Sequence, residues 1–183
     1  MVPLESGETR LLPAIVTAGD RRAAKAVHGE SKVYLEMGGL PLVAHVLLAL
    51  QRVPEVSEVW VVGDAERLAA ALGAERVRRE LRKPLHVVPQ FRNLYENAWQ
   101  TFRRLLPGAG PKGRDPVGPD LDQRVLYLSG DLPFAQPQEL SSFVRKGLAR
   151  EMDYVIGLVS EDSLAAFYPK AEREPGIRMA YFN

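Results

Sequence analysis

The sequence predicts an α/β protein with a doubly wound, mostly parallel, Rossmann-like sheet that carries helices on both faces. The first observation is that short apolar runs alternate with helical stretches along the chain, which is the pattern of such a sheet. The second is that these runs are rich in valine, isoleucine and leucine and mostly do not alternate with polar residues. Such runs are typical of parallel strands buried on both faces.

The individual elements follow from these runs and from the residues that interrupt them. The expected strands are Leu12 to Thr17, Glu58 to Gly63, Leu85 to Pro89, Val125 to Ser129 and Tyr154 to Val159. The expected helices are Pro41 to Arg52, Ala65 to Glu80, Leu94 to Leu106 and Pro137 to Arg150. Pro41 and Pro137 fall in first turns, where a missing N–H breaks no hydrogen bond. The stretch 107–123 is rich in glycine and proline and predicts a flexible surface loop.

Length and composition limit the class of protein. At 183 residues the chain is expected to form a single domain, residues 1–183. It has no cysteine, which excludes disulfides, thiolate metal ligands and a cysteine nucleophile. The net charge of +1 gives no overall field that favours nucleic acid, and no apolar run reaches the ~20 residues of a membrane span. We therefore expect a cytoplasmic protein that binds neither nucleic acid nor membrane.

The first strand ends in Thr17, Ala18 and Gly19 and leads into a basic loop that reaches Ser31 and Lys32. Glycine lets a ligand approach the backbone closely, and backbone N–H groups with basic side chains suit phosphates. An ordinary strand-ending glycine before a solvated loop is the alternative. That alternative explains Gly19 alone, but not its combination with Lys32 and the Gly-Gly-Leu-Pro segment that follows.

Two segments together resemble the nucleotidyltransferase superfamily. They are TAGDRRAAKAVHGESKVYLEMGGLPLVAHVL, residues 17–47, and VLYLSGDLPFAQPQEL, residues 125–140. The superfamily includes sugar-1-phosphate nucleotidyltransferases, molybdenum-cofactor guanylyltransferases and cytidylyltransferases of small alcohols. Its pattern is a strand ending in Ala-Gly, a glycine-rich loop with an arginine, Ser/Pro-Lys, Gly-Gly-x-Pro-Leu, and later a strand ending in Gly-Asp-x-Pro.

The resemblance implies a magnesium-dependent transfer of a nucleoside monophosphate from a nucleoside triphosphate to a phosphorylated acceptor, with a sugar 1-phosphate as the first candidate, and release of pyrophosphate. It implies that Lys32 and Arg22 contact the reacting phosphates and that Asp131 binds Mg²⁺. The residues implied in nucleotide binding are Thr17, Ala18, Gly19, Arg21, Lys25 and Asn97. The region 90–97 occupies the place where the superfamily recognises the base. The oligomeric state is not indicated.

The sequence departs from the superfamily pattern in two places. The common Ala-Gly-x-Gly-x-Arg would place glycine at position 21 and arginine at position 23, whereas this chain has Arg21 and Ala23. Superfamily members also continue past the equivalent of Asn183 and supply a second metal-binding aspartate there. A truncated chain, or a regulatory domain that binds nucleotide or sugar phosphate without catalysis, is therefore the alternative hypothesis. A glycosyltransferase is less favoured because Ser129-Gly130-Asp131 lacks the Asp-x-Asp motif.

Several polar residues have structural interpretations instead. Asp64 and Asn93 stand where helix N-caps are expected, and Glu96 follows Asn93 at capping-box spacing. His45 lies on an apolar helix and is expected to be a satisfied histidine near the core. The basic cluster RVRRELRK, residues 76–83, is expected to be a solvated helix end. Asp131 could likewise be a turn residue, since Asp-x-Pro is ordinary turn chemistry.

Overall fold

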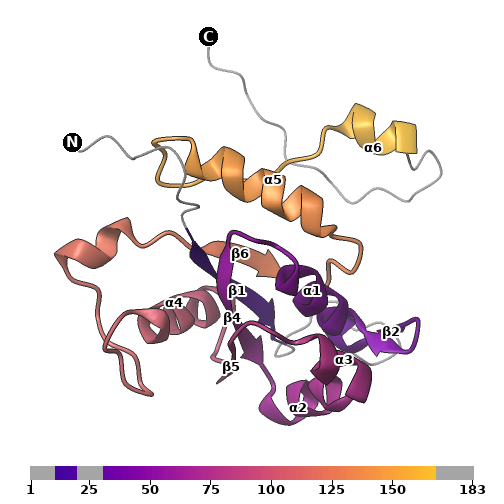
Figure 1. Cartoon of the computed structure of the whole chain (residues 1–183), viewed down its shortest axis with the longest axis horizontal. Coiled ribbons are helices and arrows are strands. Elements are labelled where there is room, and N and C mark those ends of the chain that lie inside the picture. Colours follow the sequence, from indigo (N-terminus) through magenta and orange to yellow (C-terminus); the bar gives the residue numbers. More distant parts are fainter. Residues whose placement is uncertain (1–10, 20–30, 168–183) are drawn as a thin grey trace. The chain divides into compact units, whose positions relative to one another are not determined.

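The computed structural model describes residues 11–19 and 31–167 (Figure 1). The chain divides into two compact units, residues 1–149 and 150–183. The first unit contains a four-stranded sheet in the order β5-β4-β1-β6, and its neighbouring strands all pair in parallel. Its strands are β1 Leu12–Ala18, β4 Val56–Gly63, β5 Leu85–Pro89 and β6 Leu126–Ser129. The predicted α/β fold with a mostly parallel sheet is confirmed.

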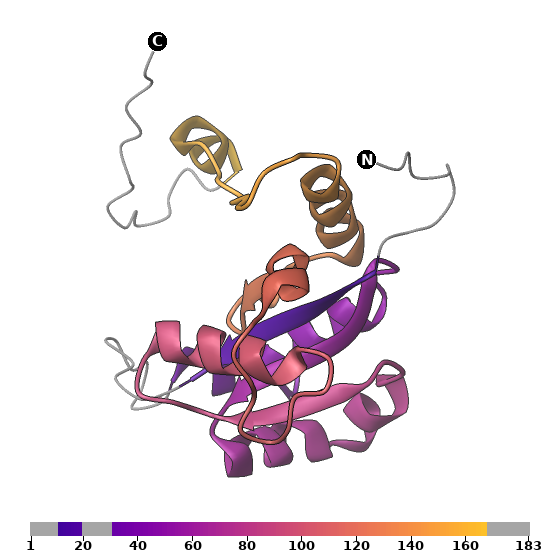
Figure 2. The same ribbon diagram turned by 90° about the vertical axis from the view of Figure 1, so that its left-hand side faces the viewer.

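The helices of the first unit cover both faces of this sheet. They are α1 Leu42–Gln51, α2 Ala65–Gly73, α3 Glu75–Glu80, α4 Leu94–Leu105 and α5 Pro137–Leu148, with 3-10 turns η1 Lys32–Tyr34 and η2 Gly118–Asp122. In Figure 1 α4 lies to the left of the sheet and α1 to the right, and in Figure 2 α4 lies in front of the sheet. A two-stranded antiparallel hairpin, β2 Glu36–Met37 and β3 Leu40–Pro41, precedes α1.

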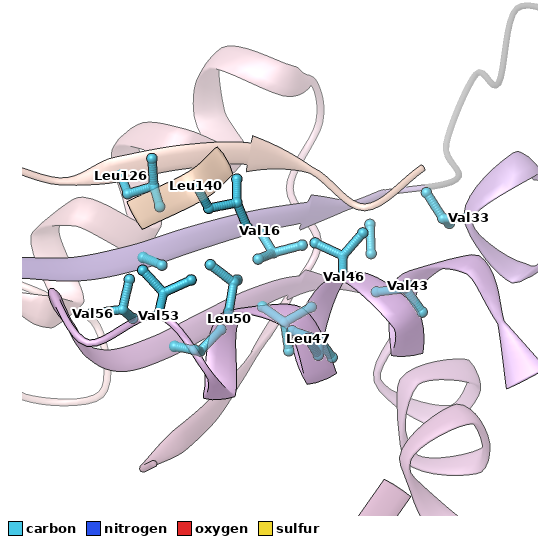
Figure 3. Close-up of a cluster of buried hydrophobic side chains, with 14 of the residues drawn as sticks. Val16, Val33, Val43, Val46, Leu47, Leu50, Val53, Val56, Leu126 and Leu140 are labelled. Atoms are coloured by element: carbon cyan, nitrogen blue, oxygen red, sulfur yellow. The ribbon is translucent and has the colours of Figure 1, made fainter. Parts of the chain in front are cut away.

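The central strand β1 shows why both faces need cover, because all seven of its residues are buried. Val16 belongs to the main apolar cluster, together with Leu47 and Leu50 of α1, and Figure 3 shows its side chain beside these helix residues. The next residue back, Ile15, belongs to a separate cluster against which Phe102 of α4 packs. Successive residues of a strand point to opposite faces, so an uninterrupted apolar run forms two cores at once.

Most helices and strands differ from their predicted bounds by no more than two residues. Three predictions are wrong. Tyr154–Val159 forms no strand and has no ladder partner among the described residues; most of its apolar side chains are exposed, and a strand needs a neighbour to satisfy its backbone. The helix expected from Ala65 to Glu80 is interrupted at Ala74, whose ψ of 129° is extended.

The third correction concerns Pro41, which does not start the helix. It pairs with Glu36 in the hairpin, and α1 begins one residue later. Pro137, in contrast, is the first residue of α5 as predicted. In the second unit, residues 161–167 form the short helix α6 Glu161–Phe167. None of the described helices is long and apolar enough to cross a membrane.

Candidate functional site

The carboxyl ends of the four parallel strands bring the two sequence motifs to one edge of the sheet. Thr17 of β1 is in register with Ser129 of β6, and Ala18 is in register with Gly63 of β4. Asp131 follows Ser129 by two residues. Binding sites of open α/β sheets lie at this edge. The fold therefore places the Thr17–Gly19 segment beside the strand that carries Asp131, although more than a hundred residues separate them in sequence.

Two glycines allow the strand ends to approach each other. The amide of Gly130 donates a hydrogen bond to the carbonyl oxygen of Thr17 at 2.8 Å, and a Cβ at position 130 would lie 3.0 Å from that same oxygen. At position 63 a Cβ would lie 2.7 Å from the carbonyl oxygen of Ala18. Any larger residue at these positions must displace the backbone that leads into Gly19.

Gly19 lies against a buried amide from α4. Asn97 is 5% exposed, and its Oδ1 accepts a hydrogen bond from the amide of Phe91 at 2.6 Å. Its Nδ2 lies 2.9 Å from the position that a Cβ on residue 19 would occupy, and Oε1 of Gln90 lies 3.5 Å from it. An N–H donor and an oxygen acceptor thus converge beside the exposed backbone of Gly19, and the missing Cβ leaves the space between them open.

Asp131 is half-buried at the end of β6, where its Oδ1 accepts a hydrogen bond from the Ser129 hydroxyl at 2.5 Å. No group of three or more His, Cys, Asp or Glu side chains that could hold a metal occurs among the described residues. Mg²⁺ commonly keeps several waters and is held by one or two carboxylates together with substrate phosphates. A carboxylate beside a hydroxyl at this edge fits such an ion, whereas the described residues offer no protein cage.

The remaining predicted site residues have different outcomes. Lys32 begins η1 with an exposed side chain, and Tyr34 at the end of the same turn donates a hydrogen bond from its hydroxyl to the carbonyl oxygen of Ala18 at 3.2 Å. The turn that carries Lys32 is thereby attached to the end of β1. Arg21, Arg22 and Lys25 lie outside the described residues. The roles of all these residues remain predictions.

The structural interpretations of the capping residues are confirmed. Asp64 accepts a hydrogen bond from the amide of Arg67 at 2.9 Å and caps α2. Asn93 accepts one from the amide of Glu96 at 2.8 Å and caps α4. The Glu96 carboxylate bonds to Arg92. Among the described residues it forms no hydrogen bond with the backbone of Asn93, so the reciprocal bond of a capping box is missing at this helix start.

The basic cluster and His45 also have structural partners. His45 Nε2 lies 2.7 Å from the carbonyl oxygen of Met37 and ties α1 to the β2–β3 hairpin. Lys83, the last cation of the cluster 76–83, donates to the carbonyl oxygens of Leu50 and Val53 at the end of α1. Burial lowers the pKa of this ammonium, and the negative charge of Glu55 partly offsets that effect. The prediction of a solvated helix end therefore does not account for Lys83, which caps the carboxyl end of a different helix, α1.

Tyr34 and Gly63 were not singled out by sequence reasoning, and Gln90 was named only as the first residue of the base-recognition region 90–97. A buried tyrosine usually needs a partner for its hydroxyl. The position of Tyr34 in the apolar stretch after Lys32 could therefore have predicted that its hydroxyl forms a hydrogen bond. The partner itself, a backbone carbonyl sixteen residues earlier, leaves no trace in the sequence. Gly63 ends a strand as many glycines do, and only the parallel register with Ala18 reveals its role.

Comparison with known proteins agrees with this architecture. No protein-family model matches the chain. It is 27% identical over 131 residues to a 2-C-methyl-D-erythritol 4-phosphate cytidylyltransferase of Chlorobium luteolum, an alignment that covers 72% of this chain and 52% of that protein. The chain therefore spans about half the length of this curated relative.

Two solved structures have a similar fold. A 4-diphosphocytidyl-2C-methyl-D-erythritol synthase of Anaerococcus prevotii superposes with a TM-score of 0.54 at 16% identity, over 84% of this chain and 61% of that one. A CMP:2-keto-3-deoxy-manno-octonic acid synthetase in complex with CTP superposes with a TM-score of 0.51 at 17% identity, over 74% of this chain and 46% of that one. The resemblance of this chain to the nucleotidyltransferase superfamily is thereby confirmed, in its fold and in its sequence similarity to a cytidylyltransferase.

Proposed function

We propose that the protein is a magnesium-dependent nucleotidyltransferase, with CTP as the first candidate donor and a small phosphorylated molecule, such as a sugar 1-phosphate, as the acceptor. The observation that carries the proposal is the convergence of Gly19, Asn97 and the Asp131 strand at one edge of the parallel sheet. The similarity to a cytidylyltransferase in sequence supports CTP as the donor.

The reaction requires little covalent chemistry from the protein. An oxygen of the acceptor phosphate bonds to the α-phosphorus of the triphosphate, the bond from that phosphorus to the bridging oxygen breaks, and the electron pair leaves with pyrophosphate. The acceptor phosphate is already ionised near neutral pH, so no side chain has to remove a proton. The protein contributes alignment and charge neutralisation.

Each predicted residue has a role in this proposal. Asp131 holds Mg²⁺, which when bound neutralises phosphate charge and orients the triphosphate. Lys32 and Arg22 neutralise charge on the reacting phosphates as cationic donors. The other residues proposed to hold the nucleotide are Thr17, Ala18, Gly19, Arg21, Lys25 and Asn97.

Base recognition is proposed to involve the two amides beside Gly19. The Nδ2 group of Asn97 is a hydrogen-bond donor, and Oε1 of Gln90 is an acceptor. Cytosine presents the ring acceptor N3 next to the exocyclic N4 amine, which is a donor. An N–H donor paired with an oxygen acceptor at this distance from Gly19 complements that edge. Uracil has a carbonyl in place of the amine, and it would bring two acceptors together at Gln90.

The proposal is tested by thermal shift with each of the four ribonucleoside triphosphates, with and without Mg²⁺. A ligand at 100 times its Kd stabilises the folded state by about 2.7 kcal/mol, which corresponds to roughly 5–10 °C for a chain of this size. We expect the largest shift with CTP and Mg²⁺. Asp131→Ala should abolish the magnesium-dependent part, and the control Asp153→Ala, an exposed carboxylate, should keep it.

Pyrophosphate release with a panel of sugar phosphates then separates transfer from binding. Turnover by the wild-type protein supports the enzyme. A shift with CTP but no turnover for any acceptor would support the alternative that the departures at positions 21 and 23 leave a binding domain without catalysis. If no triphosphate raises the melting temperature, the nucleotide site itself is refuted.

A further inference from the structure

Tyr34 makes a contact that bears directly on the backbone of the candidate site. It ends the 3-10 turn that begins with Lys32, its side chain is 7% exposed, and its hydroxyl donates to the carbonyl oxygen of Ala18. The bond joins two segments of the first motif, the end of β1 and the turn after the basic loop. The hydroxyl of a buried tyrosine is rarely left without such a partner.

The consequence for Gly19 follows from peptide geometry. The carbonyl of Ala18 and the N–H of Gly19 belong to the same rigid, planar peptide unit, and no cis peptide occurs among the described residues. In a trans peptide the C=O and N–H point in opposite directions. A hydrogen bond that fixes the Ala18 carbonyl therefore also fixes the direction of the Gly19 N–H, which points away from Tyr34.

The space around this carbonyl restricts the peptide further. Gly63 on the neighbouring strand is so close that a Cβ there would lie 2.7 Å from the Ala18 oxygen. The backbone of β4 and the Tyr34 hydroxyl therefore both lie close to this carbonyl. Without the hydroxyl, the carbonyl of this peptide would lose its hydrogen bond to Tyr34.

The ring of Tyr34 is itself held from α2. The guanidinium carbon of Arg67 lies 4.0 Å from the ring centroid, a distance at which a cation is attracted to the aromatic face. The backbone of Arg67 is fixed in turn, because its amide donates to the capping carboxylate of Asp64 at 2.9 Å. Contacts therefore run from the cap of α2, through Arg67 and Tyr34, to the Ala18–Gly19 peptide.

We infer that Tyr34 is a positioning residue that orients the Gly19 N–H toward the bound nucleotide, and that Arg67 supports it by holding the ring. The inference rests on the proposed function, since it assigns a purpose to the orientation of Gly19. Neither side chain has to touch the substrate for this effect. Both act through the peptide that joins Ala18 to Gly19.

The test is Tyr34→Phe, which removes the hydroxyl and keeps the ring under Arg67. Loss of one hydrogen bond should weaken affinity for the magnesium-bound triphosphate by roughly 3–10-fold, as measured by calorimetric titration. The exchange rate of the Gly19 amide with deuterium, followed by NMR on the unliganded protein, should rise. Tyr154→Phe, a matched change at a 75% exposed tyrosine, should alter neither quantity.

The exchange measurement needs no ligand, so it separates the two proposals. If the wild-type protein binds no triphosphate, the proposed function fails, and faster exchange at Gly19 in Tyr34→Phe still supports control of the peptide. If the wild type binds and Tyr34→Phe matches it in both affinity and Gly19 exchange, the positioning role is overturned. Equal loss of protection across the whole of β1 would also overturn it, because that result indicates general destabilisation.

A second variant covers the case in which Tyr34→Phe does not fold. Arg67→Gln removes the cation above the ring and leaves the Tyr34 hydroxyl and the Asp64 cap in place. We expect a smaller effect in the same direction, about 2–5-fold in affinity. The control Arg76→Gln changes an exposed cation of α3 and should leave affinity unchanged. Equal affinities of Arg67→Gln and the wild type would refute the supporting role of Arg67.

Discussion

At the scale of single residues, the site depends as much on side chains that are missing as on those that are present. Gly63 and Gly130 flank β1 on its two sides, and each leaves room for a carbonyl of that strand. Their absent Cβ atoms let three strand ends lie close enough for Thr17–Gly19 and Asp131 to share one edge. Neither glycine needs to touch a ligand to have this effect.

The first prediction at this scale is that Gly63→Ala displaces the Ala18 peptide. An added Cβ at 2.7 Å from a backbone oxygen forces the strand ends apart, because neither partner is a flexible side chain. Overpacking of this kind costs about 1–3 kcal/mol, so we expect a lower melting temperature by differential scanning calorimetry and weaker triphosphate binding.

Gly73→Ala is the matched control for that substitution. Gly73 ends α2, and a Cβ there would meet nothing within 4 Å. The same chemical change should therefore be neutral, or stabilising by up to about 1 kcal/mol. Equal melting temperatures for the two alanine variants would contradict the close approach of β4 and β1.

Sequence reasoning could select some of the candidate site residues because they belong to motifs with local spacing. Gly19, Lys32 and Asp131 each stand at a fixed offset from a strand end, and offsets are visible in a sequence. The contacts of Tyr34 and Asn97 are different, because they depend on which carbonyl or glycine the tertiary fold brings near. The amide of Asn97 is beside Gly19 only because α4 packs on the face of β1 that carries Ile15.

At the scale of elements, the glycine- and proline-rich stretch 107–123 has more internal structure than its composition suggests. Arg114 forms a two-pronged ion pair with Asp120, at 2.6 and 2.8 Å, and its Nε donates to the carbonyl oxygen of Pro107. The Asp120 carboxylate also accepts a hydrogen bond from the amide of Val117 at 2.8 Å. The stretch is also joined to α4, since the Arg114 amide donates to the carbonyl oxygen of Arg103.

We predict that Asp120→Asn destabilises this stretch in a pH-dependent way. The hydrogen bonds from Arg114 and from the Val117 amide lower the pKa of Asp120 from 3.8 to about 2. Because the folded state binds this proton less readily than the unfolded state, the carboxylate contributes stability above the ordinary pKa and loses it as the pH falls toward 2. The melting-temperature difference between wild type and Asp120→Asn should therefore be constant above about pH 5 and shrink below about pH 4.

Hydrogen exchange of the Arg114 and Val117 amides should show the same dependence locally. Asp122→Asn, two residues further on at an exposed position, is the control. A melting-temperature difference that stays the same from pH 7 to pH 2 would rule out the Arg114–Asp120 pair as its source. The flexibility of the stretch 107–123 remains a prediction from composition. The Arg114–Asp120 pair is the contact that we expect to oppose opening of this stretch.

At the scale of the whole molecule, the buried apolar clusters found among the described residues draw their members from residues 12–148. The boundary between the two units falls directly after this range, at Ala149. Length and composition predict a single domain, and they do not report where contacts concentrate within it. The prediction of a strand at Tyr154–Val159 is wrong because an apolar run suggests a strand, but only a neighbouring strand can supply its hydrogen bonds.

We therefore predict that a chain ending at Ala149 folds cooperatively. Because none of the described residues 150–167 belongs to a buried cluster, its melting temperature should lie within a few degrees of that of the full chain, about 1 kcal/mol or less in stability. Circular dichroism on both chains measures this. A truncated chain without a cooperative transition would show that residues 150–183 contribute to the stability of the first unit.

The strand order has a consequence for how the protein is made. β1 lies between β4 and β6, yet it leaves the ribosome before both of them. Its hydrogen-bonding edges stay unpaired until strands that follow much later in the sequence arrive, and contacts between distant segments form slowly. Thr17 meets β6 last of all, since its partner Ser129 is synthesised after β4, β5 and α4. The edge that joins Gly19 to Asp131 can therefore be completed only after β6 has been synthesised.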